Sequence, residues 1–66
     1  MLIVTNADRR ALAFCSSGAR LWFARHHLDW TQFLLHGLPA DAFEAIGDAF
    51  ALEIIAQARK RVADGQ

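Results

Sequence analysis

The side chains that could carry chemistry lie between positions 15 and 36. They are a single cysteine, Cys15, and three histidines, His26, His27 and His36. A zinc site needs ligands that converge, but adjacent residues on a helix point about 100° apart. The sequence also has no helical i, i+4 pair of His or Cys and no CxxC motif. We therefore expect no metal and no cofactor, and we interpret the histidine pair as surface residues closing a helix.

Nucleophilic catalysis would need a thiol or hydroxyl beside a base. Cys15 is predicted on the buried face of a helix, where a free cysteine packs as a small apolar residue. Ser16 and Ser17 have no base at a useful spacing, and the sequence contains no GxSxG motif. A chain of 66 residues has little room for a substrate pocket. We therefore expect the protein not to be an enzyme.

Length and composition indicate one small domain spanning residues 1–66. Hydrophobic residues make up 55% of the chain, which argues against disorder. A lone cysteine excludes a disulfide within the monomer and fits a cytosolic setting. The apolar run MLIV at positions 1–4 is far shorter than the roughly 20 residues of a membrane-spanning helix. Because Arg9 and Arg10 follow this run instead of preceding it, we expect no signal peptide and no membrane partner.

Apolar residues recur with the helical period in three stretches that have capping residues at their ends. The expected helices span residues 6–27, 29–36 and 39–63. Thr5 or Asn6 can cap the first helix. Pro39 suits the first turn of the third, and Asp41 with Glu44 offers an alternative cap there. The predicted fold class is all-α: a small three-helix bundle preceded by a short apolar N-terminal segment.

The middle helix has the clearest local signals. Asp29 is a good N-cap, and Gln32 stands three residues later, where it can complete a capping box. Gly37 supplies a left-handed stop at the C-terminal end. This helix is short, so packing must hold it in place.

Two glycines fall inside the apolar stripes of the first and third predicted helices. Gly18 and Gly47 each cost on the order of 1 kcal/mol relative to alanine at an interior helical position. We interpret this cost as the sign of a close crossing between the two helices. Trp22 and Phe50 are expected to fill the flanks of the crossing.

The chain has more apolar residues than so small a bundle can bury. The residues expected to bind a partner are Met1, Leu2, Ile3, Trp30, Leu34 and Leu52. The MLIV segment could add to a partner as a strand, or it could cover one end of the bundle. The sequence therefore predicts a protein partner, either another copy in a homo-oligomer or another subunit of a complex.

The formal net charge of zero arises because basic and acidic segments of the chain cancel. Residues 1–28 are basic, residues 29–53 are acidic, and residues 59–61 restore the balance. We expect these segments to complement one another within the fold, although one segment could instead face a partner.

Residues 29–63 also mimic a helix-turn-helix, with the HGLP run as the turn. The first turns of the third helix would then enter the major groove of DNA. They carry Asp41, Glu44 and Asp48, which would repel phosphates, so we do not expect a nucleic-acid partner.

The segment from residue 15 to 51 resembles short proteins encoded in tailed-phage and prophage genomes. The matching residues are Cys15, Gly18, Ala19, Arg20, Trp22, Phe23, Arg25, His26, Leu28, Asp29, Trp30, Phe33, Leu34, Gly37, Leu38 and Pro39. His27 stands where the pattern has a glycine that ends a helix, so the first helix could end a residue or two away. The resemblance implies a phage context and no particular chemistry.

The expected function is a small non-enzymatic helical protein that acts by protein–protein contact. The resemblance favours a phage structural or assembly component, located in the bacterial host cytoplasm or in the virion. The main alternative is a phage-encoded inhibitor of a host protein, such as an anti-defence factor, whose acidic segment 41–53 could imitate nucleic acid. A helix-turn-helix regulator is a third interpretation.

Overall fold

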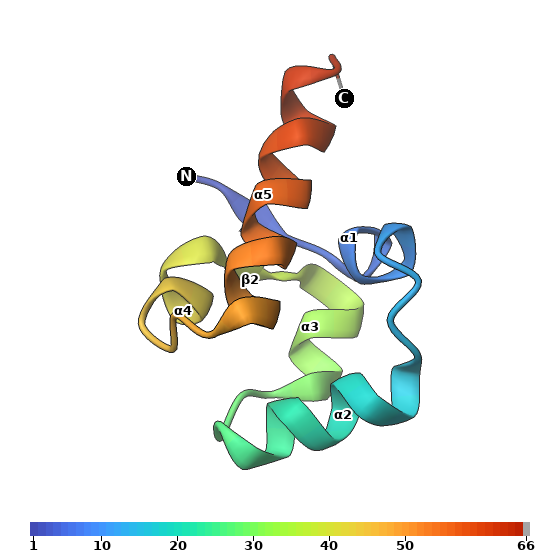
Figure 1. Ribbon diagram of the computed structural model, residues 1–66, viewed down its shortest axis with the longest axis vertical. Coiled ribbons are helices and arrows are strands. Elements are labelled where there is room, and N and C mark those ends of the chain that lie inside the picture. The colour runs from blue at the N-terminus through green and yellow to red at the C-terminus, as the bar shows by residue number, and fades with distance from the viewer. Residues whose placement is uncertain (66) are drawn as a thin grey trace.

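The structure is a computed structural model that describes residues 1–65 of the chain. This part is mostly helical, with five helices and one two-stranded sheet (Figure 1). The elements are β1 (Ile3–Val4), α1 (Asn6–Ala11), α2 (Ser16–Arg25), α3 (Trp30–His36), β2 (Leu38–Pro39), α4 (Ala40–Glu44) and α5 (Ala49–Ala63). Helix α2 lies across one end of the molecule, and α5 extends toward the opposite end (Figure 1). The prediction of a purely helical three-helix bundle is therefore wrong in its architecture.

The N-terminal segment forms a strand with its own chain. β1 pairs antiparallel with β2, with Ile3 opposite Pro39 and Val4 opposite Leu38. The side chain of Val4 is fully buried. Of the two roles left open for the MLIV segment, covering its own domain is the one observed.

The expected helix 6–27 is wrong, because the chain breaks between α1 and α2. Within the break Ala13 has a φ of 57°, a left-handed conformation that residues other than glycine rarely adopt. The Arg9 guanidinium spans the break and donates from Nη1 to the carbonyl oxygen of Phe14 at 2.7 Å. The Phe14 ring packs on that of Phe50, with 4.5 Å between centroids. Contacts made across the fold thus hold a break that no glycine or proline marks.

The expected helix 39–63 is also wrong, because α4 and α5 are separate helices. Gly47 lies between them with a φ of 68°, in the left-handed region that favours glycine. Asp48 then caps α5, since its Oδ1 accepts a hydrogen bond from the Ala51 amide at 2.9 Å. A glycine stop followed by an aspartate cap therefore divides this segment.

The proposed helix crossing at Gly18 and Gly47 is not present. Gly47 lies in a turn, and its conformation, not close packing, accounts for the glycine there. A Cβ added to Gly18 would meet Cys15 Sγ at 3.4 Å and no atom of α5 among its nearest neighbours. Trp22 and Phe50 do contact each other edge to face, with 4.8 Å between ring centroids. The two aromatic residues expected beside the crossing are therefore in contact, although no approach of the two glycines brings them together.

The middle helix is confirmed in position and in its N-cap. Helix α3 begins after Asp29, whose Oδ1 accepts a hydrogen bond from the Gln32 amide at 3.0 Å. Gly37 follows its last residue with a φ of 77°. Just before this helix, His27 has a φ of 59° and so adopts the conformation for which glycine is suited. Helix α2 ends two residues earlier than expected, at Arg25.

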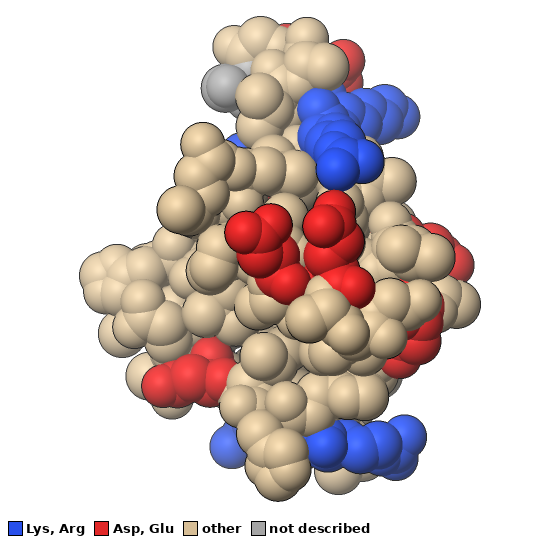
Figure 2. Space-filling model, turned by 90° about the vertical axis from the view of Figure 1, so that its left-hand side faces the viewer, with Lys and Arg blue, Asp and Glu red and all other residues tan. Residues whose placement is uncertain are grey.

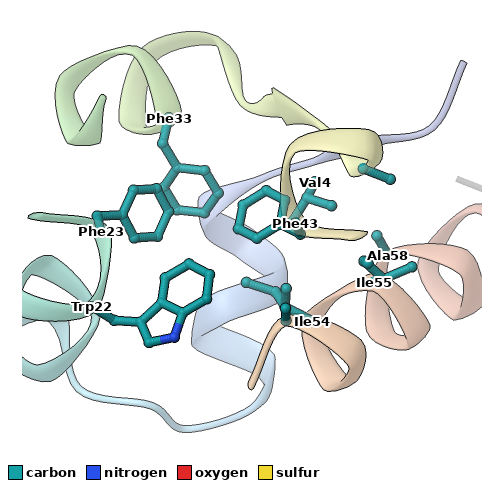
Figure 3. Close-up of a cluster of buried hydrophobic side chains, with 10 residues drawn as sticks. Val4, Trp22, Phe23, Phe33, Phe43, Ile54, Ile55 and Ala58 are labelled. Atoms are coloured by element: carbon teal, nitrogen blue, oxygen red, sulfur yellow. The ribbon is translucent and has the colours of Figure 1, made fainter. Parts of the chain in front are cut away.

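The core is an aromatic cluster joined to an aliphatic one (Figure 3). Its residues are Val4, Trp22, Phe23, Phe33, Ala40, Phe43, Ala51, Ile54, Ile55 and Ala58. The fully buried Phe23 has ring centroids 4.7 Å from Phe33 and 5.9 Å from Phe43. The rings from α2, α3 and α4 point toward one another, and α5 supplies the isoleucines (Figure 3). Four of the five helices, α2 to α5, therefore meet around one small core.

A buried ion pair fastens the N-terminal region to α5. Asp8 of α1 is completely buried, and its Oδ1 and Oδ2 accept hydrogen bonds from Arg61 Nε at 2.8 Å and Nη2 at 3.2 Å. The Thr5 amide donates to Asp8 Oδ2 at 2.9 Å, and Arg61 Nη2 also donates to the Ile3 carbonyl at 2.8 Å. These contacts with Asp8 raise the pKa of Arg61. The residues join β1, α1 and α5 in one charged network.

Candidate protein-interaction surface

The residues predicted to bind a partner divide into two groups. Met1, Leu34 and Leu52 are exposed, as the prediction requires. The other three are half-buried against their own chain: Leu2, Ile3 and Trp30. The structure therefore leaves part of the predicted set available for contact and uses the rest for folding.

The half-buried members have clear internal roles. The Trp30 ring packs edge to face on Phe23, with 5.0 Å between centroids, and lies 5.8 Å from Phe33. The Leu2 carbonyl accepts a hydrogen bond from the Ala40 amide at 2.9 Å. Ile3 pairs with β2 in the sheet. These residues continue the core outward, so we expect their substitution to destabilise the fold.

Three exposed apolar residues were not predicted. Leu21 is 66% exposed, Leu35 is 69% exposed and Val62 is 48% exposed. Leu21 precedes Trp22 and Phe23, the two large side chains that α2 buries, and is left on the outer side of that helix. The signal that could have located Leu35 is the run of three large apolar residues from Phe33 to Leu35 on a short capped helix, since successive residues on a helix point about 100° apart and three in a row cover too wide an arc to be buried together.

The outward side of α2 combines arginine with leucine. Its exposed residues are Ser16, Ser17, Arg20, Leu21, Ala24 and Arg25. Positions four apart on a helix share a face, so Arg25 lies one turn beyond Leu21. We call Arg20, Leu21, Ala24 and Arg25 the α2 face.

The exposed residues of α4 and the first half of α5 combine acids with leucine and alanine. They include Asp41 and Glu44 on α4, and Ala49, Leu52, Glu53 and Ala56 on α5. These helices pack against each other, and Glu44 Oε2 lies 3.7 Å from Arg59 Nη2. Figure 2 shows acidic groups at the centre of the side on which α4 lies, with basic groups toward both ends. We call Asp41, Leu52 and Glu53 the acidic set.

One cluster joins an acid, a histidine and an indole at the surface. Trp22 Nε1 donates to Asp48 Oδ2 at 2.8 Å, and His26 Nε2 lies 3.9 Å from the same oxygen. The Trp22 and His26 rings also contact each other, with 4.7 Å between centroids. Hydrogen bonds from the Ala51 amide and from Trp22, together with the nearby His26, lower the pKa of Asp48. The arrangement stabilises the α5 N-terminus on α2, so we assign it a structural role.

Cys15 is exposed, which corrects the prediction that it lies on a buried helix face. It is the N-cap residue of α2, and its Sγ lies 3.6 Å from Ser17 Oγ. The hydrogen bonds from Ser17 and from the Gly18 backbone lower the pKa of the thiol. The N-terminus of a helix also stabilises a thiolate, which lowers the pKa of the thiol as well.

The remaining sequence features can be placed within residues 1–65. The structure brings no three His, Cys, Asp or Glu side chains there into a group that could hold a metal ion, and that part of the chain encloses no pocket. None of its helices combines the length and the apolar character needed to cross a bilayer. The sites that stand out are therefore the exposed leucines and the charges around them.

Comparison of the chain with protein-family models, with curated proteins and with solved structures gives no match.

Proposed function

We propose that this chain is a small non-enzymatic helical protein that acts by binding another protein, as a structural or assembly component of a tailed phage. The observation that carries the proposal is the set of large apolar side chains left on the surface of so small a domain. They are Met1, Leu21, Leu34, Leu35, Leu52 and Val62. Single exposed apolar residues are ordinary, but Leu34 and Leu35 are exposed next to each other on α3, and adjoining exposed apolar side chains are typical of contact surfaces.

The adjacent leucines of α3 show why these side chains point to a partner. Phe33 is the one fully buried residue of α3, and it anchors the helix to the core. Leu34 and Leu35 lie on its exposed sides and contribute little to that anchoring. A polar residue at either position would leave the fold in place, so folding does not explain why both positions are leucine. Contact with a partner does explain it.

The phage context comes from the resemblance over residues 15–39. Many of its residues have a folding role here: Trp22, Phe23 and Phe33 lie in the core, Asp29 caps α3 and Gly37 ends it. The matching residues therefore include those that hold α2 and α3 in place, and the resemblance supports a phage setting without indicating a particular chemistry.

The two alternative functions fit the geometry less well. An inhibitor that imitates nucleic acid needs a run of free acids, but Glu44 and Asp48 have the basic partners Arg59 and His26. A helix-turn-helix regulator would present α4, which has five residues and exposes Asp41 and Glu44. Such a helix is short, and its acids repel phosphate.

The test measures the amount of this chain in purified phage particles and in their assembly intermediates by quantitative mass spectrometry. The variant Leu34→Lys/Leu35→Lys is compared with Thr31→Lys/Gln32→Lys, which adds the same charge to exposed positions of the same helix. We expect the wild type and the control in particles at many copies. We expect the leucine variant to melt as the wild type does, since surface changes shift stability by only about 0.5 kcal/mol, and to be missing from particles.

Two results would contradict the proposal. One is incorporation of the leucine variant at the wild-type level. The other is absence of the wild-type chain from particles and intermediates together with its co-purification with a host protein, which would support the inhibitor function instead.

A further inference from the structure

We propose that the partner includes a second copy of this chain, with the α2 face of one copy binding the acidic set of the next. This inference rests on the proposed function, because it names a partner for a chain that acts by protein contact. It follows from the exposed charges and leucines that the α2 face and the acidic set both leave without partners in the part of the same chain that the structure describes.

The α2 face is basic, apolar and unpaired. Arg20 and Arg25 are exposed and form no ion pair with any other residue among positions 1–65. Leu21 lies between them on the helix and is 66% exposed. Ala24 is small, so another helix can approach the backbone closely at this point. A fitting partner therefore offers acids around an apolar side chain.

The acidic set offers those features. Asp41 and Glu53 are exposed and, within the described part of the chain, form no ion pair. Leu52 is adjacent to Glu53 and is 55% exposed. The neighbouring exposed residues of α5, Ala49 and Ala56, are small enough to admit a second helix. The charges, the leucine and the small residues thus complement those of the α2 face.

The two surfaces lie in different parts of one molecule. Helix α2 lies across one end, and α4 lies to one side of the lower half of α5 (Figure 1). The basic groups at the lower end of Figure 2 are level with α2, and the acidic groups lie above them. Each copy therefore presents both a basic and an acidic surface. A contact between unlike surfaces leaves one of each free for a further copy.

The expected contact is weak because the surfaces are small. The chain exposes 4206 Å² in total, and a standard interface takes about 800 Å² from each partner. That is almost a fifth of the surface of the chain, whereas the α2 face comprises four residues of one helix. We therefore expect association that depends on protein concentration and that weakens with salt, as contacts between exposed charges do.

The test is analytical ultracentrifugation of the full chain over a range of concentrations, at about 0.02 M and about 0.5 M salt. Two variants reverse the charges: Arg20→Glu/Arg25→Glu on the α2 face and Asp41→Lys/Glu53→Lys in the acidic set. A matched control, Arg10→Glu/Lys60→Glu, reverses two exposed basic residues elsewhere. We expect the average mass of the wild type and of the control to rise with concentration at low salt. Each reversal variant alone should associate about tenfold more weakly.

The decisive sample is the equimolar mixture of the two reversal variants. Each mixed contact then pairs opposite charges again, so the mixture should associate as strongly as the wild type. The proposal is overturned if the wild type is monomeric at every concentration, if the control weakens association as much as the reversals do, or if the mixture stays monomeric. Those results leave particle incorporation through Leu34 and Leu35 unaffected, so this inference and the proposed function fail separately.

Discussion

Replacing Arg61 with methionine should remove much of the stability of this domain. Methionine keeps most of the length of the side chain but removes the guanidinium that donates to Asp8 and to the Ile3 carbonyl. The Asp8 carboxylate would stay fully buried with no cation beside it. Removing one partner of a buried pair typically costs about 3–5 kcal/mol, because the remaining charge is desolvated and uncompensated.

The structure places the expected loss at the lower end of that range. The Arg61 side chain is 27% exposed, so water can partly replace it, and Thr5 still donates to the carboxylate. We therefore expect a loss of about 3 kcal/mol. A domain of 66 residues has roughly 3–10 kcal/mol of stability in all, so the loss is a large share of the total. With a urea slope near 1 kcal/mol per molar, the midpoint should fall by about 2–3 M.

The assay is urea unfolding followed by the fluorescence of Trp22 and Trp30 and by far-ultraviolet circular dichroism. Arg59→Met is the matched control, because Arg59 pairs with Glu44 at 3.7 Å through exposed side chains. Exposed pairs contribute about 0–1 kcal/mol, so the control should barely move the midpoint. Arg61→Lys should lie between the two, since it keeps a cation but loses the two-pronged geometry.

The double variant Asp8→Asn/Arg61→Met separates the pair from its parts. Removing both charges eliminates the unpaired carboxylate, so the double variant should be less unstable than the sum of the single losses. Equal midpoints for Arg61→Met and Arg59→Met would refute the reasoning, as would losses at Asp8 and Arg61 that simply add.

Three further predictions follow from local geometry. Gly37→Ala should lower the melting temperature sharply, because the residue has a φ of 77° and its new Cβ would lie 2.7 Å from atoms of β1. Gly18→Ala should raise or preserve the melting temperature, because the nearest atom to its new Cβ is 3.4 Å away. Equal melting temperatures for the two variants would contradict this. Hydrogen bonds lower the folded-state pKa of Asp48, so its contribution to stability is complete above its ordinary pKa of 3.8 and is lost as the pH falls through the lower folded value. Asp48→Asn should therefore be less stable than the wild type at neutral pH, and urea titrations should show that difference shrinking below pH 3.8; a difference independent of pH would argue against it. Cys15 should react with iodoacetamide near neutral pH faster than an unperturbed thiol, and Ser17→Ala should slow it; identical rates would exclude the hydrogen bond as the cause.

The parts of the fold that were predicted correctly depend on signals a few residues apart. Helix α3 is bounded by Asp29, which caps it through the backbone amide of residue 32, and by Gly37, while the Gln32 side chain makes no capping bond of the kind expected. A cap and a stop act through the backbone of their immediate neighbours, so the sequence contains them in readable form.

The breaks at Ala13 and Gly47 escaped the sequence interpretation for two different reasons. The first is held by contacts of Phe14 with Phe50, which is far away in sequence, and no local residue type indicates it. The second did have a local signal, glycine followed by aspartate, but the apolar period continues from Phe43 to Phe50 across the turn and hid it. Periodicity alone cannot distinguish one long helix from two helices that face the same core.

The division of the chain into short helices also shapes the surface on which the proposed function depends. A continuous helix would bury one long stripe, whereas short helices around an aromatic cluster bury roughly one turn each and leave their outer leucines in solvent. Helices α2 and α3 anchor themselves through Phe23 and Phe33, and both phenylalanines are essentially completely buried. Leu21 and Leu35, on the same helices, remain mostly exposed. The side chains that hold these helices in the core therefore differ from those proposed to bind a partner, and substitutions at the leucines can test contact without disturbing the core.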